Sequence, residues 1–160
     1  MHHSTILGVD LGNTIVRAQR RSDLEPGAAR PLPVAYPDAL ETLYDLGALV
    51  KEIHIVSRVT PEQKVRALQW LEASDFYTKT NIPKTRVHFC AERHEKAGIC
   101  KPLGITHFID DRPEVLAHMH GVIKIAFDPH PSDFKKFEKE NPDTLIVSNW
   151  QDVRRYFKLP

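Results

Sequence analysis

The sequence predicts an α/β fold in which a mainly parallel sheet of about five or six strands carries helices on both faces. Short apolar runs alternate along the chain with segments of helical periodicity, the pattern of βαβ units. Two of the apolar runs end in acids, because Ile6–Val9 precedes Asp10 and residues 107–109 precede Asp110 and Asp111. Parallel strands bring their carboxyl ends to one edge of a sheet, so the sequence predicts a ligand site where these acids meet.

Length and composition favour one soluble globular domain over residues 1–160, with residues 15–37 as a loop or flap insertion and no separate cap domain. Twenty-two basic and 21 acidic side chains give a formal charge of +1, which offers no electrostatic basis for binding nucleic acid or a membrane surface. No apolar run approaches the roughly 20 residues of a membrane span, and no signal peptide is recognised. Cys90 and Cys100 suit two buried or half-buried thiols in a reducing compartment. We therefore expect a cytoplasmic protein.

The first elements are a strand, a proline-rich loop and a helix. The strand is expected over residues 5–10. Residues 17–37 contain four prolines, which resist both a helix interior and a central strand, so we expect a loop that can hold a short hairpin. Asp38 can cap a helix over residues 39–51, where leucines recur with helical spacing.

The middle of the chain predicts a strand, a long helix and a second strand. The strand over residues 52–57 ends at Ser57. Residues 60–63, Thr-Pro-Glu-Gln, supply a cap, a proline at the first helical position and a glutamine at the third, which predicts a helix to residue 73. Its predicted inward residues are Val65, Leu68 and Leu71. A connection over residues 74–84 with a short helical turn near Phe76 leads to a strand over residues 86–89.

The last third of the chain continues the alternation. A helix over residues 92–103 closes at Gly104, and a strand follows over residues 106–110. Arg112 and Pro113 open a helix to residue 118, and the next strand covers residues 121–127. Residues 129–141 are expected to form a loop or a short exposed helix, and residues 145–147 a short sixth strand. Asn149 then caps a final helix over residues 150–157.

Four chemical signals follow one another along the chain: Asp10, Ser57, a lysine at 96 or 101, and the pair Asp110–Asp111. Each of these residues alone has an ordinary structural interpretation, as a cap or as a solvated helix residue, but their order favours phosphoryl transfer. A carboxylate can attack phosphorus, and carboxylates together with phosphate suit Mg²⁺. A hydroxyl and an ammonium group can hold the remaining phosphate oxygens.

This order of motifs resembles the haloacid dehalogenase (HAD) superfamily, a large group dominated by magnesium-dependent phosphatases. The resemblance spans nearly the whole chain and is carried by residues 6–14, 53–57 and 96–113. It implies a three-layer Rossmann-like, HAD-like fold, Mg²⁺ as cofactor, and a phosphatase or phosphotransferase that acts on a phosphorylated substrate through an aspartyl-phosphate at Asp10.

The resemblance also implies a role for each matching residue. Asp10 is the nucleophile, Ser57 supplies the phosphate-binding hydroxyl, and Lys96 is the better candidate for the phosphate lysine, with Lys101 second. Thr14 and Arg58 are further predicted contacts of substrate or phosphate. The predicted Mg²⁺ ligands are Asp10, the backbone carbonyl of Gly12, Asp110 and Asp111, the last as a ligand or as the partner of a metal-bound water.

One position departs from the family pattern. The first motif of the family reads Asp-x-Asp-x-Thr, whereas residues 10–14 here read Asp-Leu-Gly-Asn-Thr. Gly12 therefore stands where the general acid and base is expected, and the loss of such a group slows a reaction by roughly a hundred- to ten-thousand-fold. We expect weakened turnover. The alternative is a non-catalytic HAD-like protein that binds metal or phosphate, or that regulates a partner.

Two other interpretations are less favoured. Dehalogenases and phosphonate-cleaving members also lack the second aspartate, but they usually carry a helical cap for which residues 15–52 leave no room. A capless site is open, and it would suit a large substrate or completion by a neighbouring subunit of a homo-oligomer. Residues 8–14 also look like the phosphate loop of actin-like kinases, a fold that needs two related domains and a second such loop.

Overall fold

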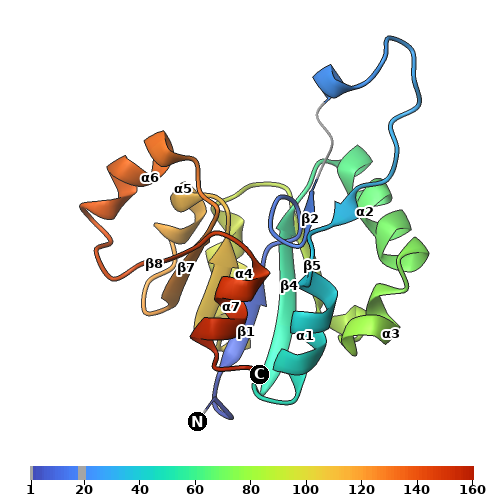
Figure 1. Ribbon diagram of the computed structural model, residues 1–160. Coiled ribbons are helices and arrows are strands. Elements are labelled where there is room, and N and C mark those ends of the chain that lie inside the picture. Colours follow the sequence, from blue (N-terminus) through green and yellow to red (C-terminus); the bar gives the residue numbers. More distant parts are fainter. Residues whose placement is uncertain (1, 18–20) are drawn as a thin grey trace.

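A six-stranded parallel sheet forms the centre of the protein, which a computed structural model describes over residues 2–17 and 21–160 (Figure 1). The strand order is β5-β4-β1-β6-β7-β8, and every pairing is parallel. The strands are β1 Ile6–Val9, β4 Glu52–Arg58, β5 Val87–Cys90, β6 His107–Asp110, β7 Ile123–Phe127 and β8 Leu145–Val147. The predicted α/β fold, including its short last strand, is confirmed.

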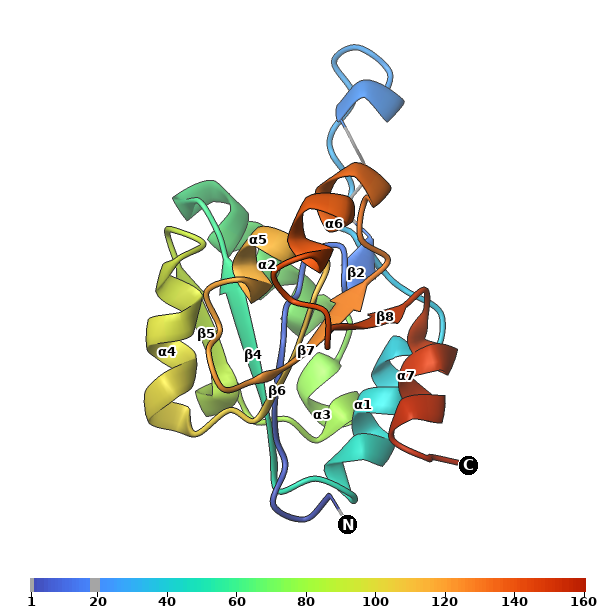
Figure 2. The ribbon, with the colours of Figure 1, turned by 90° about the vertical axis from the view of Figure 1, so that its left-hand side faces the viewer.

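Helices cover both faces of this sheet (Figure 2). One face carries α1 Ala39–Gly47, α2 Pro61–Ala73, α3 Phe76–Thr80 and α7 Trp150–Tyr156. The other face carries α4 Glu95–Leu103, α5 Pro113–Leu116 and α6 Pro131–Glu138. Two short 3-10 helices, η1 Arg21–Asp23 and η2 Lys84–Arg86, lie in connections. Within the described ranges, no helix combines the length and the apolar character that a membrane crossing requires.

The proline-rich loop contains the short hairpin that the sequence predicts. Strand β2 Val16–Arg17 pairs antiparallel with β3 Val34–Ala35, and residues 21–33 project beyond the carboxyl edge of the sheet (Figure 1). Residues 18–20 of the predicted flap lie outside the described residues.

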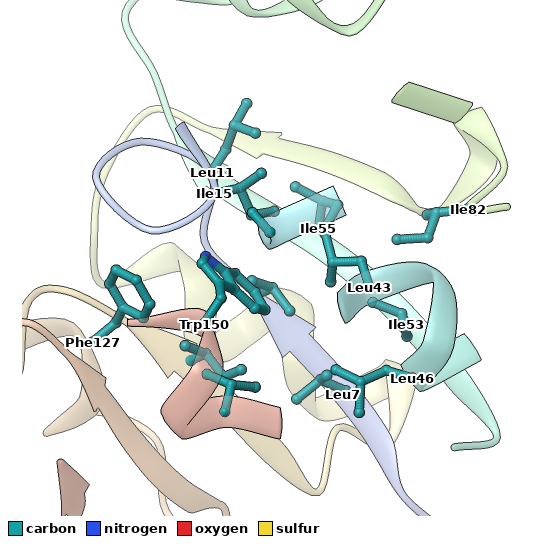
Figure 3. Packing of buried hydrophobic residues seen from close by; sticks show 14 of the residues in the cluster. Leu7, Leu11, Ile15, Leu43, Leu46, Ile53, Ile55, Ile82, Phe127 and Trp150 are labelled. Atoms are coloured by element: carbon teal, nitrogen blue, oxygen red, sulfur yellow. The ribbon is translucent and has the colours of Figure 1, made fainter. Parts of the chain in front are cut away.

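The larger hydrophobic core lies between the sheet and the layer of α1, α2, α3 and α7 (Figure 3). Ile53 and Ile55 of β4 point into this core. Val56 of the same strand points to the opposite face of the sheet and packs in the second core, as the alternation of side chains along a strand requires. Trp150 at the start of α7 is 1% exposed, and its indole N–H donates to the carbonyl oxygen of Thr14 over 2.8 Å. The core therefore holds the turn that follows β1.

Gly8 in the middle of β1 allows the second core to close against the strand. A Cβ atom at this position would lie 2.4 Å from Cδ2 of Phe108, so the phenyl ring packs directly on the backbone of β1. Phe108 is fully buried, and its ring lies beneath the Lys96 ammonium group, with 5.8 Å from Nζ to the ring centroid. The glycine therefore contributes to the floor on which the Lys96 side chain lies.

The inward face predicted for α2 is partly wrong. Leu71 is buried, but Val65 and Leu68 are 56% and 43% exposed. The helix instead directs Ala67, Trp70 and Leu71 at the core, which is an i, i+3, i+4 stripe rotated from the predicted one. The position of the sheet, which a helical pattern alone does not contain, decides which stripe faces inward.

Several helix ends also differ from the prediction. Asp38 precedes α1 in a left-handed conformation with φ 64° and makes no side-chain capping bond, and α1 ends at Gly47, not at residue 51. Helix α4 begins at Glu95, not at residue 92, because the Glu95 carboxylate accepts from the Glu92 backbone N–H over 2.8 Å and closes a preceding turn. Helix α5 ends at Leu116, two residues early.

Three predicted helix caps are confirmed. Thr60 and Gln63 form a reciprocal capping box at the start of α2. Gly104 ends α4 with φ 70°, in the left-handed region that favours glycine. Asn149 caps α7 by accepting from the backbone N–H of Asp152 over 2.9 Å.

Candidate active site

A cavity of about 230 Å³ opens at the carboxyl edge of the sheet. From β1 the chain adds β4 and β5 on one side, and it then returns to add β6, β7 and β8 on the other side of β1. The strand order therefore reverses at the boundary between β1 and β6. Such a reversal is where open α/β sheets bind ligands. The predicted site residues on the cavity wall are Asp10, Gly12, Ser57, Arg58, Lys96, Asp110 and Asp111.

Three aspartates form one cluster at the ends of the two central strands. Asp10, Asp110 and Asp111 each offer a carboxylate oxygen, and these oxygens lie within 4.8 Å of one another. Asp10 and Asp110 are buried, and Asp111 is half-buried. The backbone N–H of Asp10 donates to the Ile109 carbonyl over 2.9 Å, which continues the pairing of β1 with β6 and keeps the carboxylates together.

Lys96 joins two of these carboxylates from the first turn of α4. Its Nζ lies 2.9 Å from Oδ1 of Asp10 and 2.8 Å from Oδ2 of Asp110, and the residue is 2% exposed. The other oxygen of Asp110 accepts from the backbone N–H of Arg112 over 2.9 Å. Lys101 is exposed further along α4 and does not line the cavity, so the structure brings Lys96, and not Lys101, to the site.

Burial and mutual repulsion disfavour the charged forms of the acids. Burial, followed by the charges of Asp10 and Asp110, raises the pKa of Asp111 to about 9. Burial and the Asp10 charge raise the pKa of Asp110 to about 6, against the opposing effect of Lys96. Burial alone would lower the pKa of Lys96, but the two aspartates next to it reverse this effect and raise it above its ordinary value. One ammonium group is therefore insufficient for three carboxylates.

The donor set of this cluster fits a divalent cation. Mg²⁺ prefers oxygen ligands and usually takes one or two carboxylates together with substrate phosphate and water. Asp10, Asp110 and Asp111 place carboxylate oxygens close together. The pKa values of Asp110 and Asp111 are raised because their negative charges are not fully compensated, and a cation at this point would compensate them. Gly12 lines the same cavity and is half-buried. Coordination of Mg²⁺ by its backbone carbonyl stays a prediction.

Gly12 also leaves the site without a general acid at that position. A Cβ atom at this position would meet no atom within 4 Å, and the backbone does not have a positive φ, so neither a Cβ contact nor the backbone excludes a side chain here. Among the described residues that line the cavity, the three aspartates are the only acids and no histidine occurs. The neighbouring Asn13 is exposed and has φ 57°.

The two predicted hydroxyl groups lie in different places. Ser57 near the end of β4 is 4% exposed and lines the cavity. Thr14 is fully buried, does not line the cavity, and donates its hydroxyl to Oδ2 of Asp10 over 3.4 Å. Thr14 therefore lies behind the carboxylate of Asp10 and outside the cavity lining, and its predicted contact with substrate stays a prediction.

One wall of the cavity consists of residues that are not among the site residues predicted from the sequence. Helix α2 and the flap supply it, with Gln63, Arg66, Ala67 and Trp70 from the helix and Arg30, Pro31 and Pro33 from the flap. The guanidinium group of Arg66 donates to the carbonyl oxygens of Arg30 and Pro31 and so holds the flap beside the site. The spacing of the four helical residues at i, i+3, i+4 and i+7 is a sequence signal for this wall.

No family model matches the chain, and no curated protein matches it. Solved structures do. A haloacid dehalogenase-like family hydrolase from Xanthomonas campestris matches with a TM-score of 0.63 and 12% identity over 98% of this chain and 97% of that one. D,D-heptose 1,7-bisphosphate phosphatase from B. bronchiseptica, complexed with magnesium and phosphate, matches with a TM-score of 0.64 and 8% identity over 96% and 98%. A HAD-superfamily hydrolase from Ehrlichia chaffeensis matches with a TM-score of 0.64 and 13% identity over 99% and 98%.

These matches distinguish between the folds that the sequence suggests. Each extends over nearly all of both chains, and the single parallel sheet is not the two-domain architecture of the actin-like kinases. At identities this low, structural likeness establishes the fold and leaves the reaction to be argued from the site. The chain has the haloacid dehalogenase-like fold.

Proposed function

We propose that the protein is a Mg²⁺-dependent phosphatase or phosphotransferase that acts on phosphate monoesters through an aspartyl-phosphate at Asp10. The observation that carries the proposal is the buried bridge from Lys96 to both Asp10 and Asp110 beside a third carboxylate. The site lies at the switch point of the sheet, and the phosphatase from B. bronchiseptica with a similar fold was solved with magnesium and phosphate.

In the first step, a carboxylate oxygen of Asp10 forms a bond to phosphorus while the bond from phosphorus to the ester oxygen breaks. The leaving group departs with the electron pair of that bond. Lys96 and Ser57, both on the cavity wall, bind phosphate oxygens and stabilise the charge that develops on them. Mg²⁺ held by the three aspartates would supply further neutralisation of the phosphate charge. Water, or an acceptor hydroxyl in a phosphotransferase, then takes the phosphoryl group and regenerates Asp10.

Gly12 makes the choice of leaving group important. An alkoxide leaves slowly unless an acid protonates it, and no side chain at position 12 can do so. Aryl phosphates, whose phenolate leaves without protonation, are therefore the favoured test substrates. The second step also lacks a base to activate water, so hydrolysis of the aspartyl-phosphate is expected to limit turnover.

The test is Mg²⁺-dependent hydrolysis of an aryl phosphate by the unchanged protein, Asp10→Asn and Gly12→Asp. We expect slow hydrolysis by the unchanged protein, none by Asp10→Asn, and a rate about a hundredfold higher or more for Gly12→Asp. Asp143→Asn, an exposed aspartate away from the cavity, is the matched control. Hydrolysis that persists in Asp10→Asn would remove Asp10 as the nucleophile.

A binding or regulatory role without turnover is the second candidate, and Gly12 is the observation that favours it. In that case the three proteins would be inert towards aryl phosphate while the unchanged protein still binds Mg²⁺. Because a Cβ atom at position 12 would meet no neighbour within 4 Å, inactivity of Gly12→Asp would not be explained by a clash at Cβ and would support this second role.

A further inference from the structure

We propose that the cavity holds a second anion site, formed by Arg58, Arg93 and Arg112, beside the phosphate site of the proposed function. The inference rests on that function and narrows its substrate class. The substrate is a phosphate ester that carries a second anionic group, a phosphate or a carboxylate, on the same molecule.

The charges on the cavity wall exceed what one phosphate requires. Five arginines and Lys96 line the cavity, against three aspartates. Lys96, which bridges Asp10 and Asp110, is the cation that the proposed function assigns to the first phosphate together with Ser57, and a cation held by the aspartates would add positive charge. A single phosphate at Asp10 is thus already provided for. The arginines offer planar groups of N–H donors that match a further phosphate or carboxylate.

Two of these arginines share one carboxylate. Nη1 of Arg93 lies 3.1 Å from Oε1 of Glu114, and Nη1 of Arg112 lies 3.6 Å from the same oxygen. The side chains are 40% and 45% exposed, so they remain accessible to a ligand. One carboxylate between two guanidinium groups leaves a net positive charge, which an anion in the cavity would balance.

Arg58 is fixed in a different way. Its Nε donates to the carbonyl oxygen of Ala91 over 3.2 Å, which holds the guanidinium group at the end of β4 through one nitrogen. Arg66 differs from these three residues because its terminal nitrogens donate to flap carbonyls, which gives it a structural role.

The second site is built on the same strand ends and turns as the first. Arg58 directly follows Ser57, Arg112 directly follows Asp111, and Arg93 precedes Lys96 by three residues. Each arginine is therefore close in sequence to a residue of the phosphate site, and all three line the same cavity as that site. Apolar lining residues suit a carbon framework between the anions, namely Val59, Pro31, Pro33, Trp70 and Val115.

The test uses phosphonates, which bind as phosphates do but have no ester bond to cleave. Calorimetry with Mg²⁺ would compare alkane diphosphonates of increasing chain length with the matching alkyl monophosphonates. We expect at least one diphosphonate to bind the unchanged protein about tenfold more tightly than its monophosphonate, the gain expected of an added charge-assisted contact.

Variants then locate the second anion. Arg93→Ala and Arg112→Ala should each lower diphosphonate affinity about tenfold and monophosphonate affinity much less. Glu114→Gln should raise diphosphonate affinity, because it removes the carboxylate that competes for both arginines. Arg86→Ala is the matched control, since Arg86 pairs with Glu52 and does not line the cavity.

Each remaining result would overturn the inference in a distinguishable way. If monophosphonates bind but no diphosphonate binds more tightly, the second site is absent and the proposed function stands. If the arginine variants weaken both probes equally, the arginines belong to the first phosphate site. If neither class of probe binds and aryl phosphate is not hydrolysed, the proposed function fails and the inference fails with it.

Discussion

Trp150 donates its indole N–H to the carbonyl oxygen of Thr14 over 2.8 Å, although 136 positions separate the two residues in the chain. Thr14 in turn donates its hydroxyl to Oδ2 of Asp10. The last helix therefore supports the turn that carries the nucleophile of the proposed reaction, through a contact buried in the main core. Removing that contact is expected to affect both stability and turnover.

Trp150→Phe should lower the free energy of unfolding for two reasons, the smaller ring volume and the loss of the indole donor to the buried Thr14 carbonyl. The second effect is expected to be about 1–3 kcal/mol. Denaturant unfolding measures this difference. Trp70→Phe is the control, since it removes the same ring atoms from the same core without removing a bond to Thr14. Equal losses in the two variants would show that the indole bond contributes nothing.

Lys96→Gln should destabilise the cation-free protein by roughly 3 kcal/mol, because it leaves two buried carboxylates without their counter-ion. The same variant should lose aryl phosphate hydrolysis. Mg²⁺ should stabilise it more than it stabilises the unchanged protein, since the cation replaces part of the missing positive charge. Lys101→Gln, on the exposed part of the same helix, should stay within about 0.5 kcal/mol. A stable Lys96→Gln protein without Mg²⁺ would contradict the bridge.

The stabilising effect of Mg²⁺ should grow with pH. In the cation-free protein the pKa values of Asp110 and Asp111 are about 6 and about 9, above those of an unfolded aspartate. The native state then binds more protons than the unfolded state, so these two groups lower the free energy of unfolding as pH rises from about 4 to about 9. Mg²⁺ needs the ionised carboxylates, so fewer competing protons mean tighter binding.

Thermal unfolding with and without Mg²⁺ at about pH 5.5 and about pH 8.5 measures this effect. Both pH values use the same Mg²⁺ concentration, about a hundredfold above the dissociation constant at about pH 8.5, where Mg²⁺ adds about 2.7 kcal/mol, or roughly 5–10 °C in Tm for a chain of this length. The increment should be larger at the higher pH and should be lost in Asp111→Asn. An increment that is equal at both pH values would mean that Mg²⁺ binds elsewhere.

Gly12→Asp should change the shape of the reaction time course as well as its rate. In the unchanged protein, a rapid release of about one equivalent of phenol followed by a slow phase is expected, because nothing at position 12 activates water against the aspartyl-phosphate. Gly12→Asp should abolish the burst and speed the slow phase. Gly12→Asn, which adds a side chain of similar size without an acid or base, should keep the burst. A linear time course in the unchanged protein would contradict rate-limiting hydrolysis.

The sequence predicts those features that depend on neighbouring residues. Apolar runs that stop at Asp10, Ser57 and Asp110 locate the strand ends, and the caps at Thr60 and Gly104 are local hydrogen-bonding or backbone requirements. Asp38 shares the chemistry of a cap, but its left-handed backbone prevents that role.

Features that depend on how the elements pack were not predictable in the same way. The resemblance favours Lys96 over Lys101, which is also on α4, but the contacts of Lys96 with both aspartates depend on how that helix packs against the strand ends. The exposure of Val65 and Leu68 likewise follows from the rotation of α2 against the sheet. The arginines that share Glu114 come from two segments that the fold alone brings together.

The most direct test of the account is to look for the covalent intermediate. The unchanged protein would be mixed with aryl phosphate and Mg²⁺, quenched in acid, and analysed by mass spectrometry of the intact chain and of its peptides. We predict the mass of one added phosphoryl group on the peptide that contains Asp10, and none in Asp10→Asn. Phenol release with no phosphorylated Asp10 peptide, or with the phosphoryl group on another residue, would contradict the central claim.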